Sequence, residues 1–173
     1  STSIELASIS KTFIATSLMQ LYERGLFDLD DSINGYLPFP VRNPTYPGTP
    51  ITFKMLLTHT SSIVDRIPAF QPWGTPGDPT IPLDTLLYKY LTPGEIYYSN
   101  NNFSSTAPGT VWSYSNWGAT LLAYLAEVIS GMPFEQYTRD SISTPLQMTN
   151  TGWFYRDLDT NLLAHPYTYS GST

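Results

Sequence analysis

The chain has 173 residues, a formal net charge of −6 and a charged fraction of 13%, which is about half the usual value. This length is typical of one domain, and the eight scattered lysines and arginines argue against a nucleic-acid partner, which needs clustered cations. The lack of cysteine excludes disulfides, thiol catalysis and zinc–thiolate sites. No apolar run is long enough to cross a membrane.

The first predicted element is a helix that follows Ser8 and ends at Gly25, a residue suited to a helix C-terminus. Its expected core-facing residues recur near helical spacing, and they are Ile9, Phe13, Leu18, Leu21 and Tyr22, with Met19 beside them. Five prolines between residues 38 and 50 then rule out a continuous helix. We therefore expect residues 34–50 to form an extended connection on the surface.

Two short helices are predicted in the middle of the chain. Thr52 is typical of an N-terminal cap and predicts a helix over residues 52–59. A second helix is predicted over residues 82–91, because its proline suits the first turn. Residues 64–80 are rich in proline and glycine, and residues 95–112 are polar and aromatic, which predicts a loop in each case.

A longer helix is predicted over residues 117–130, where apolar residues form a stripe on one face, namely Leu121, Tyr124, Leu125, Val128 and Ile129. Ser115 or Asn116 can cap its start, and a glycine follows its end. A further helix is expected over residues 133–142. Aromatic and β-branched residues after residue 151 predict one strand or a hairpin.

Ser8-Ile9-Ser10-Lys11 places a serine three residues before a lysine at a helix start. Residues three apart share one face of a helix, so Lys11 can reach the Ser8 hydroxyl. A serine is a weak nucleophile unless a base takes its proton. A lysine can be that base only if its pKa lies well below about 10.4, which burial and a helix N-terminus favour. The alternative is an N-terminal cap followed by a solvated lysine, and this short motif alone does not decide between them.

Tyr114-Ser115-Asn116 stands just before the helix predicted over residues 117–130. A tyrosine can act as a general base when cations lower its pKa from about 10, and an asparagine amide can orient a substrate carbonyl or hold a lysine. The alternative is a capping turn with an aromatic plug. Tyr98-Ser99-Asn100 has the same pattern, but Pro108-Gly109 precedes Tyr114 and an amphipathic helix follows it. We therefore prefer Tyr114.

In combination, these motifs and other segments resemble the serine β-lactamase and penicillin-binding-protein superfamily. The similar branch contains class C β-lactamases, D-alanyl-D-alanine carboxypeptidases, D-aminopeptidases and β-lactamase-like esterases. The similarity runs along nearly the whole chain in the family's order, and it rests on Ala7-Ser8-Ile9-Ser10-Lys11-Thr12-Phe13, Leu29-Asp30-Asp31, Leu56-Leu57-Thr58-His59-Thr60-Ser61, Pro108-Gly109, Tyr114-Ser115-Asn116 and Pro145-Leu146-Gln147-Met148. The resemblance implies an α/β fold of the β-lactamase/DD-peptidase type. This chain would carry mainly its helical lobe and nucleophile helix, with long loops and little sheet.

The resemblance also implies a role for each residue of the motifs. Ser8 would be the nucleophile, acylated by a β-lactam, a D-amino-acid peptide or an ester, and Lys11 would be its proton partner. Tyr114 would carry the proton to the leaving group or activate water, and Asn116 would bind substrate. The Ser8 backbone N–H would be half of an oxyanion hole, where negative charge develops. No metal or other cofactor is implied.

The sequence also departs from the family. The third motif, a Lys or His followed by a small residue and Gly, has no match, since neither His165-Pro166-Tyr167 nor Ser170-Gly171 fits it. Ser62 stands where the family signature has Gly. We interpret residues 1–173 as a single partial domain without the N-terminal strands and the C-terminal sheet. Such a fragment is expected to be inactive or weak alone, and to be able to associate with the missing part or with itself.

The main alternative is a non-catalytic binding or interaction module built on the same lobe. Its aromatic segment would bind peptidoglycan or another polymer, although such residues also pack loops or line clefts, and they are Tyr97, Tyr98, Phe103, Trp112, Tyr114 and Trp117. We expect His59 to make a structural hydrogen bond and Asp30 with Asp31 to form a polar turn. The family favours a periplasmic or secreted location and a small-molecule or peptide substrate.

Overall fold

The structure is a computed structural model that describes residues 2–66 and 77–164. His165 and the Ser170-Gly171 pair, considered above for the third motif, lie outside the described residues. The helices are α1 (Lys11–Glu23), α2 (Phe53–Leu57), α3 (Leu83–Leu91), α4 (Asn116–Ser130) and α5 (Phe134–Thr138). Shorter helical turns are η1 (Ala7–Ser10), η2 (Ile33–Gly35), η4 (Asn100–Asn102), η5 (Arg139–Ser143), η6 (Tyr155–Asp157) and η7 (Thr160–Leu162).

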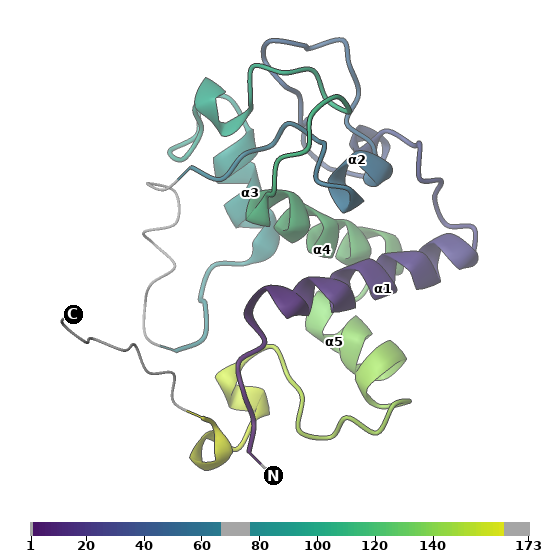
Figure 1. Cartoon of the computed structure of the whole chain (residues 1–173), viewed down its shortest axis with the longest axis vertical. Coiled ribbons are helices and arrows are strands. Elements are labelled where there is room, and N and C mark those ends of the chain that lie inside the picture. Colours follow the sequence, from purple (N-terminus) through teal and green to yellow (C-terminus); the bar gives the residue numbers. More distant parts are fainter. Residues whose placement is uncertain (1, 67–76, 165–173) are drawn as a thin grey trace, which may run out of the picture.

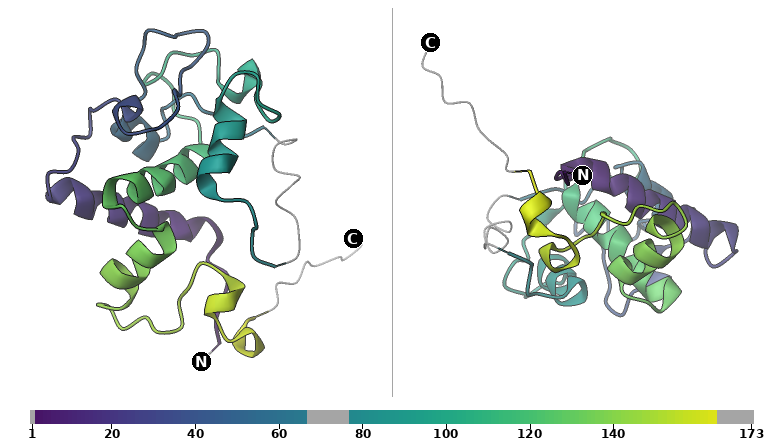
Figure 2. Two further views of the ribbon diagram at one scale, coloured as in Figure 1. Left: turned by 180° about the vertical axis from the view of Figure 1, so that it is seen from behind. Right: turned by 90° about the horizontal axis from the view of Figure 1, so that it is seen from below.

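Helix α4 lies at the centre of the fold and packs against α1, α2, α3 and α5. Helices α2 and α3 lie on one side of the α1–α4 pair, and α5 with the C-terminal turns lies on the other (Figure 1). Figure 2 shows the same arrangement from behind and from below. A helix packed on several sides must be apolar around most of its surface, and its buried residues are Trp117, Gly118, Ala119, Leu121, Leu122, Ala123, Leu125 and Ala126.

The predicted first helix is present as η1 followed by α1, and Gly25 ends it with a φ of 70°. Leu18 and Leu21 are buried as expected. The assignment of Ile9 to the core-facing stripe is wrong, because its side chain is 63% exposed. Ile9 lies in the 3₁₀ turn, whose three residues per turn carry it off the face that α1 buries.

The proline-rich connection is not confined to the surface, which corrects the prediction for residues 34–50. Val41 and Asn43 are completely buried. The Asn34 amide accepts from the Val41 N–H at 2.8 Å and donates to the Val41 carbonyl at 3.0 Å. The Asn43 amide donates to the Ser62 hydroxyl and the Ser104 carbonyl, both at 2.9 Å. These amides supply hydrogen bonds to buried polar groups, which lets an irregular segment enter the core.

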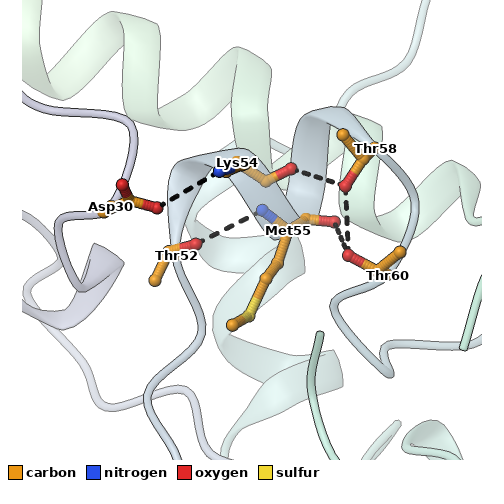
Figure 3. Close-up of polar contacts among 6 residues, drawn as sticks. All are labelled: Asp30, Thr52, Lys54, Met55, Thr58 and Thr60. Carbon is orange, nitrogen blue, oxygen red and sulfur yellow. Dashed lines mark hydrogen bonds and ion pairs between the residues drawn. The ribbon is translucent and has the colours of Figure 1, made fainter. Parts of the chain in front are cut away.

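Threonine hydroxyls form hydrogen bonds with backbone groups at both ends of α2 (Figure 3). At the start, the Thr52 hydroxyl accepts from the Met55 N–H at 3.3 Å, which confirms the predicted cap. At the end, the Thr58 hydroxyl donates to the Lys54 carbonyl at 2.8 Å. The Lys54 ammonium also forms a solvent-exposed ion pair of 3.8 Å with Asp30. These hydrogen bonds fix both ends of α2, and His59 follows directly after the cap at its C-terminal end.

The expected strand or hairpin after residue 151 is not found in the part of the chain that the structure describes. Residues 155–162 contain the two turns η6 and η7, and Leu163 makes a single parallel bridge with Ser3. A strand needs a neighbouring strand to pair its backbone, and Ser3 pairs with only this one residue. The described residues thus form a helical lobe with isolated bridges, and they contain no helix long and apolar enough to span a membrane.

Candidate active site

Ser8 lies in the turn η1, which continues directly into α1. The first N–H groups of a helix have no partner within the helix, so the Ser8 N–H lies where such groups point outward. The preceding Ala7 has a φ of 46°, a left-handed conformation that costs a non-glycine residue about 1–2 kcal/mol. The left-handed residue turns the chain into η1 immediately before Ser8, and the Ser8 side chain is exposed.

Two polar side chains meet the Ser8 hydroxyl oxygen. The Lys11 ammonium donates to Ser8 Oγ at 3.1 Å from the same helical face, as the three-residue spacing predicts. The Tyr114 hydroxyl donates to Ser8 Oγ at 2.8 Å from the start of α4. Lys11 Nζ also lies 5.0 Å from the centre of the Tyr114 ring. The packing of α1 against α4 therefore joins residues that are 106 positions apart in the sequence.

The surroundings of Tyr114 make its phenol more acidic than a free tyrosine. Hydrogen bonding to Lys11, and next to Ser8, holds the pKa of Tyr114 below its ordinary value, although partial burial and the charge of Asp65 act in the opposite direction. Tyr98, which has the same sequence pattern, instead donates to Asn100 at 3.0 Å. The fold thus brings Tyr114, and not Tyr98, to the Ser8 hydroxyl.

His59 borders this group of residues, a position that its neighbours in the sequence do not predict. It follows α2 with a φ of 55°, and its N–H donates to Leu56 while the Thr60 N–H donates to Met55. This pattern is a Schellman cap, in which His59 occupies the position that usually holds glycine. The left-handed conformation aims the imidazole at the start of α4.

The imidazole of His59 makes the structural hydrogen bond that was expected, because its Nδ1 accepts from the Ser115 N–H at 3.2 Å. Its ring lies 4.7 Å from the ring of Tyr114. Burial, and next the charge of Lys11, lowers the pKa of His59. The imidazole, which accepts this hydrogen bond through Nδ1, therefore holds the backbone beside Tyr114.

Asn116 is joined to a residue that the sequence did not single out. Its side-chain amide donates to the Asp65 carboxylate at 2.7 Å, and its backbone N–H donates to the same oxygen at 2.9 Å. A lone aspartate in a loop rich in proline and glycine carries no recognisable signal. Only the fold shows that Asp65 lies at the N-terminus of α4.

The aromatic segment divides into core and surface residues. Trp117 is buried and stacks on Tyr90 with ring centres 3.9 Å apart, and Phe103 is also buried. Trp112 is 66% exposed and lies 6.5 Å from the His59 ring. Tyr114 itself is 40% exposed.

The acidic pair Asp30 and Asp31 lies in the predicted polar turn, since the Asp31 carboxylate accepts from the Asp28 N–H and from the Tyr36 hydroxyl.

Two hollows of about 650 and 700 Å³ lie elsewhere in the described structure. Both are bordered by Glu135 and Trp153, and neither is lined by Ser8, Lys11 or Tyr114. Neither hollow therefore includes the side chains that meet at the Ser8 hydroxyl, although the smaller one is bordered by Ser10 of the same turn. Across residues 2–66 and 77–164 there is no cluster of three or more histidine and acidic side chains placed to hold a metal ion.

Residues 1–173 match the protein family described as Beta-lactamase. The D-alanyl-D-alanine-carboxypeptidase/endopeptidase AmpH of Escherichia coli K12 is 34% identical over 150 residues, covering 86% of this chain and 36% of the relative. A β-lactamase/D-alanine carboxypeptidase from Yersinia pestis aligns with a TM-score of 0.66 at 28% identity, over 86% of this chain and 40% of that one. An octameric penicillin-binding protein homologue from Pyrococcus abyssi aligns with a TM-score of 0.67 at 29% identity, over 87% of this chain and 32% of that one. The chain spans about a third of the length of these relatives.

Proposed function

Because the chain belongs to the Beta-lactamase family, whose members here are hydrolases, we propose that it is part of a serine hydrolase that works through an acyl-serine intermediate. One observation carries the proposal, namely that Lys11 Nζ and the Tyr114 hydroxyl both lie within hydrogen-bonding distance of Ser8 Oγ. A nucleophile in contact with a base, and a base held by a third group, is the arrangement that activates a serine.

In the proposed reaction, Ser8 Oγ attacks the carbonyl carbon of an amide or ester. The Ser8 proton passes to the Lys11–Tyr114 pair, whose two polar atoms contact the attacking oxygen. Lys11 favours the phenolate form of Tyr114 because it lowers the pKa of that group. The same proton is then donated to the leaving amine or alcohol, and a water activated by the pair later releases the acyl group from Ser8.

Asn116 is the proposed substrate-binding residue, and the Ser8 N–H is one of the proposed oxyanion donors. The Asn116 amide gives one N–H to Asp65, and an asparagine has a second N–H and a carbonyl oxygen with which to bind a substrate amide. The second oxyanion donor would belong to the third-motif strand. Residues 1–173 are therefore proposed to be a partial domain that acylates slowly or turns over weakly by itself.

The proposed substrates are a β-lactam, a D-amino-acid peptide or a carboxylic ester. The names of the relatives support the first two, since one is called a D-alanyl-D-alanine carboxypeptidase and another a β-lactamase. The proposed location, which follows from this family and these substrates, is the periplasm or the outside of the cell. One relative is octameric, so the proposal includes association with the missing part of the fold or with further copies.

The test is intact-mass spectrometry after incubation with a penicillin and, separately, with an activated ester. The expected result is an adduct of one acyl group that is absent from Ser8→Ala, with Ser10→Ala as the matched control in the same turn. No adduct on a chain that circular dichroism shows to be folded would refute acylation by this chain. It would favour the alternative of a non-catalytic binding module.

A further inference from the structure

We propose that Asp65 is a positioning residue that holds Tyr114 against Ser8 and Lys11 by fixing the first turn of α4. The inference rests on the proposed function, and it adds a residue from a different loop to the proton-carrying group. The Asp65 carboxylate touches neither Ser8 nor the Tyr114 hydroxyl in the contacts that the described residues make. Any geometric effect of Asp65 on the reaction must therefore act through residues 115–117, whereas its charge acts on Tyr114 through space.

The carboxylate of Asp65 accepts four hydrogen bonds at the N-terminus of α4. One oxygen accepts from the Asn116 backbone at 2.9 Å and from the Asn116 amide at 2.7 Å. The other accepts from the Trp117 N–H at 3.1 Å and from the Ser115 hydroxyl at 3.3 Å. A carboxylate at this end of a helix is favoured by the helix dipole. Three consecutive residues after Tyr114 are thus tied to one side chain.

The loop that carries Asp65 is itself held by hydrogen bonds on both sides of this residue. The Tyr90 hydroxyl donates to the Val64 carbonyl at 2.6 Å and accepts from the Arg66 N–H at 3.3 Å, so both neighbours of Asp65 contact one phenol. The Arg66 side chain donates to Asn102 Oδ1 at 2.7 Å. Asn102 is fully buried and donates to the Tyr90 carbonyl at 2.7 Å. Asp65 therefore connects the N-terminus of α4 to the hydrogen-bonded network of Tyr90 and Asn102.

Tyr114 is placed between two such attachments. On its N-terminal side the Ser113 N–H donates to the His59 carbonyl at 2.8 Å, and on its other side the Ser115 N–H donates to His59 Nδ1. Asp65 continues this series by holding Ser115, Asn116 and Trp117. Catalytic distances of about 3 Å tolerate little displacement, and a shift of about 1 Å can cost about 100-fold in rate. The Tyr114 hydroxyl is 2.8 Å from Ser8 Oγ.

The charge of Asp65 and its positioning effect act on Tyr114 in opposite directions. The charged and titratable groups around Tyr114 are Lys11 from α1, His59 after α2, and Asp65. Lys11 lowers the pKa of Tyr114, whereas the charge of Asp65 raises it. Removing only the charge of Asp65 would lower the pKa further. Displacing the phenol from Lys11 and Ser8 would raise it. The sign of the change therefore separates the two effects.

The experiment measures the pKa of Tyr114 in the whole chain by NMR of ¹³C-labelled tyrosine, with Tyr114→Phe to assign the signal. In Asp65→Asn, the expected result is a higher Tyr114 pKa and a roughly 10- to 100-fold slower acylation of Ser8 by an activated ester. A lower or unchanged Tyr114 pKa would overturn the proposal, because Asp65 would then act through its charge or through stability alone.

Asp78→Asn is the matched control. The Asp78 carboxylate also accepts two backbone hydrogen bonds at the start of a helical turn, from Tyr155 at 2.6 Å and from Arg156 at 3.2 Å. This variant should change stability and leave the Tyr114 pKa and the acylation rate unaltered. A change of the Tyr114 pKa as large as that in Asp65→Asn would show a general effect of weakened folding and would overturn the proposal.

A second variant serves if Asp65→Asn does not fold. Asp65→Glu keeps the charge and moves the carboxylate by one methylene, so the Tyr114 pKa should rise, and an unchanged value would overturn the proposal. The NMR measurement also keeps the two proposals distinct. If the chain with its natural Ser8 is not acylated at all, the proposed function fails for this chain, while the pKa change still decides the role of Asp65.

Discussion

The imidazole of His59 lies against the ring of Tyr114, with ring centres 4.7 Å apart and planes inclined by 36°. His59 reaches this place only because it ends α2 in a left-handed conformation, with a φ of 55°. Glycine would fit that backbone at less cost, but it has no side chain to accept the Ser115 N–H. The histidine therefore adopts a strained backbone conformation, and its side chain makes a hydrogen bond to Ser115 beside the proposed proton carrier Tyr114.

His59 should make the chain less stable as the solution becomes acidic. Its pKa is lowered in the folded state, so the unfolded chain takes up the proton first. The free energy of unfolding should therefore fall as pH drops below about 6.5 and level off below the folded-state pKa. His59→Asn keeps an acceptor and tolerates a positive φ, and it should lose this component. Urea denaturation between about pH 7.5 and 5 gives both curves, and parallel curves would contradict the expectation.

Tyr114→Phe should slow the acylation of Ser8 by about 100-fold or more, because the variant keeps the ring but loses the hydroxyl that contacts Ser8 Oγ. Tyr98→Phe is its control, since Tyr98 has the same sequence pattern but bonds to Asn100. Stopped-flow acylation by an activated ester measures both rates. Equal losses in the two variants would remove Tyr114 from the mechanism.

Lys11→Met should both slow acylation and raise the pKa of Tyr114, because Lys11 is the largest cause that lowers it. The raised pKa of Tyr114 should move the pH profile of the acylation rate to higher pH. Lys54→Met is a suitable control, since the Lys54 ammonium is an exposed partner of Asp30 at 3.8 Å. The coupling between Lys11 and Tyr114 is disproved if the profile of Lys11→Met stays where it was and only its height changes.

Much of the helical fold follows from local signals in the sequence. The Thr52 cap, the glycine after α1 and the apolar stripe of α4 all predicted elements that the structure contains. Such features depend on neighbours within one or two turns. The buried course of Val41 and Asn43 could not be predicted in this way, because it depends on amide contacts to Ser62 and Ser104, which are distant in sequence.

The site divides along the same line. The spacing of Ser8 and Lys11 predicted their contact, since both lie on one helical face. The sequence pattern selected Tyr114 over Tyr98, but the 2.8 Å contact with Ser8 depends on how α1 packs on α4. Asp65 and the proximity of His59 were out of reach, because tertiary packing alone brings those loops to the start of α4.

Ser62 offers a test of backbone strain away from the reacting groups. It has a φ of 68° and is buried, and its hydroxyl accepts one of the hydrogen bonds of the Asn43 amide, which also reaches the Ser104 carbonyl. Ser62→Gly relieves the left-handed strain and loses that bond, so its stability should stay within about 1 kcal/mol of the natural chain.

Ser62→Ala loses the same hydrogen bond and keeps the strain. It should therefore be less stable than Ser62→Gly by about 1 kcal/mol, which urea denaturation of the two variants resolves. Both should leave the acylation of Ser8 unchanged, since Ser62 contacts Asn43 and Ser104 in the turn region and none of Ser8, Lys11 or Tyr114. If alanine proves as stable as glycine here, the left-handed backbone at residue 62 carries no strain.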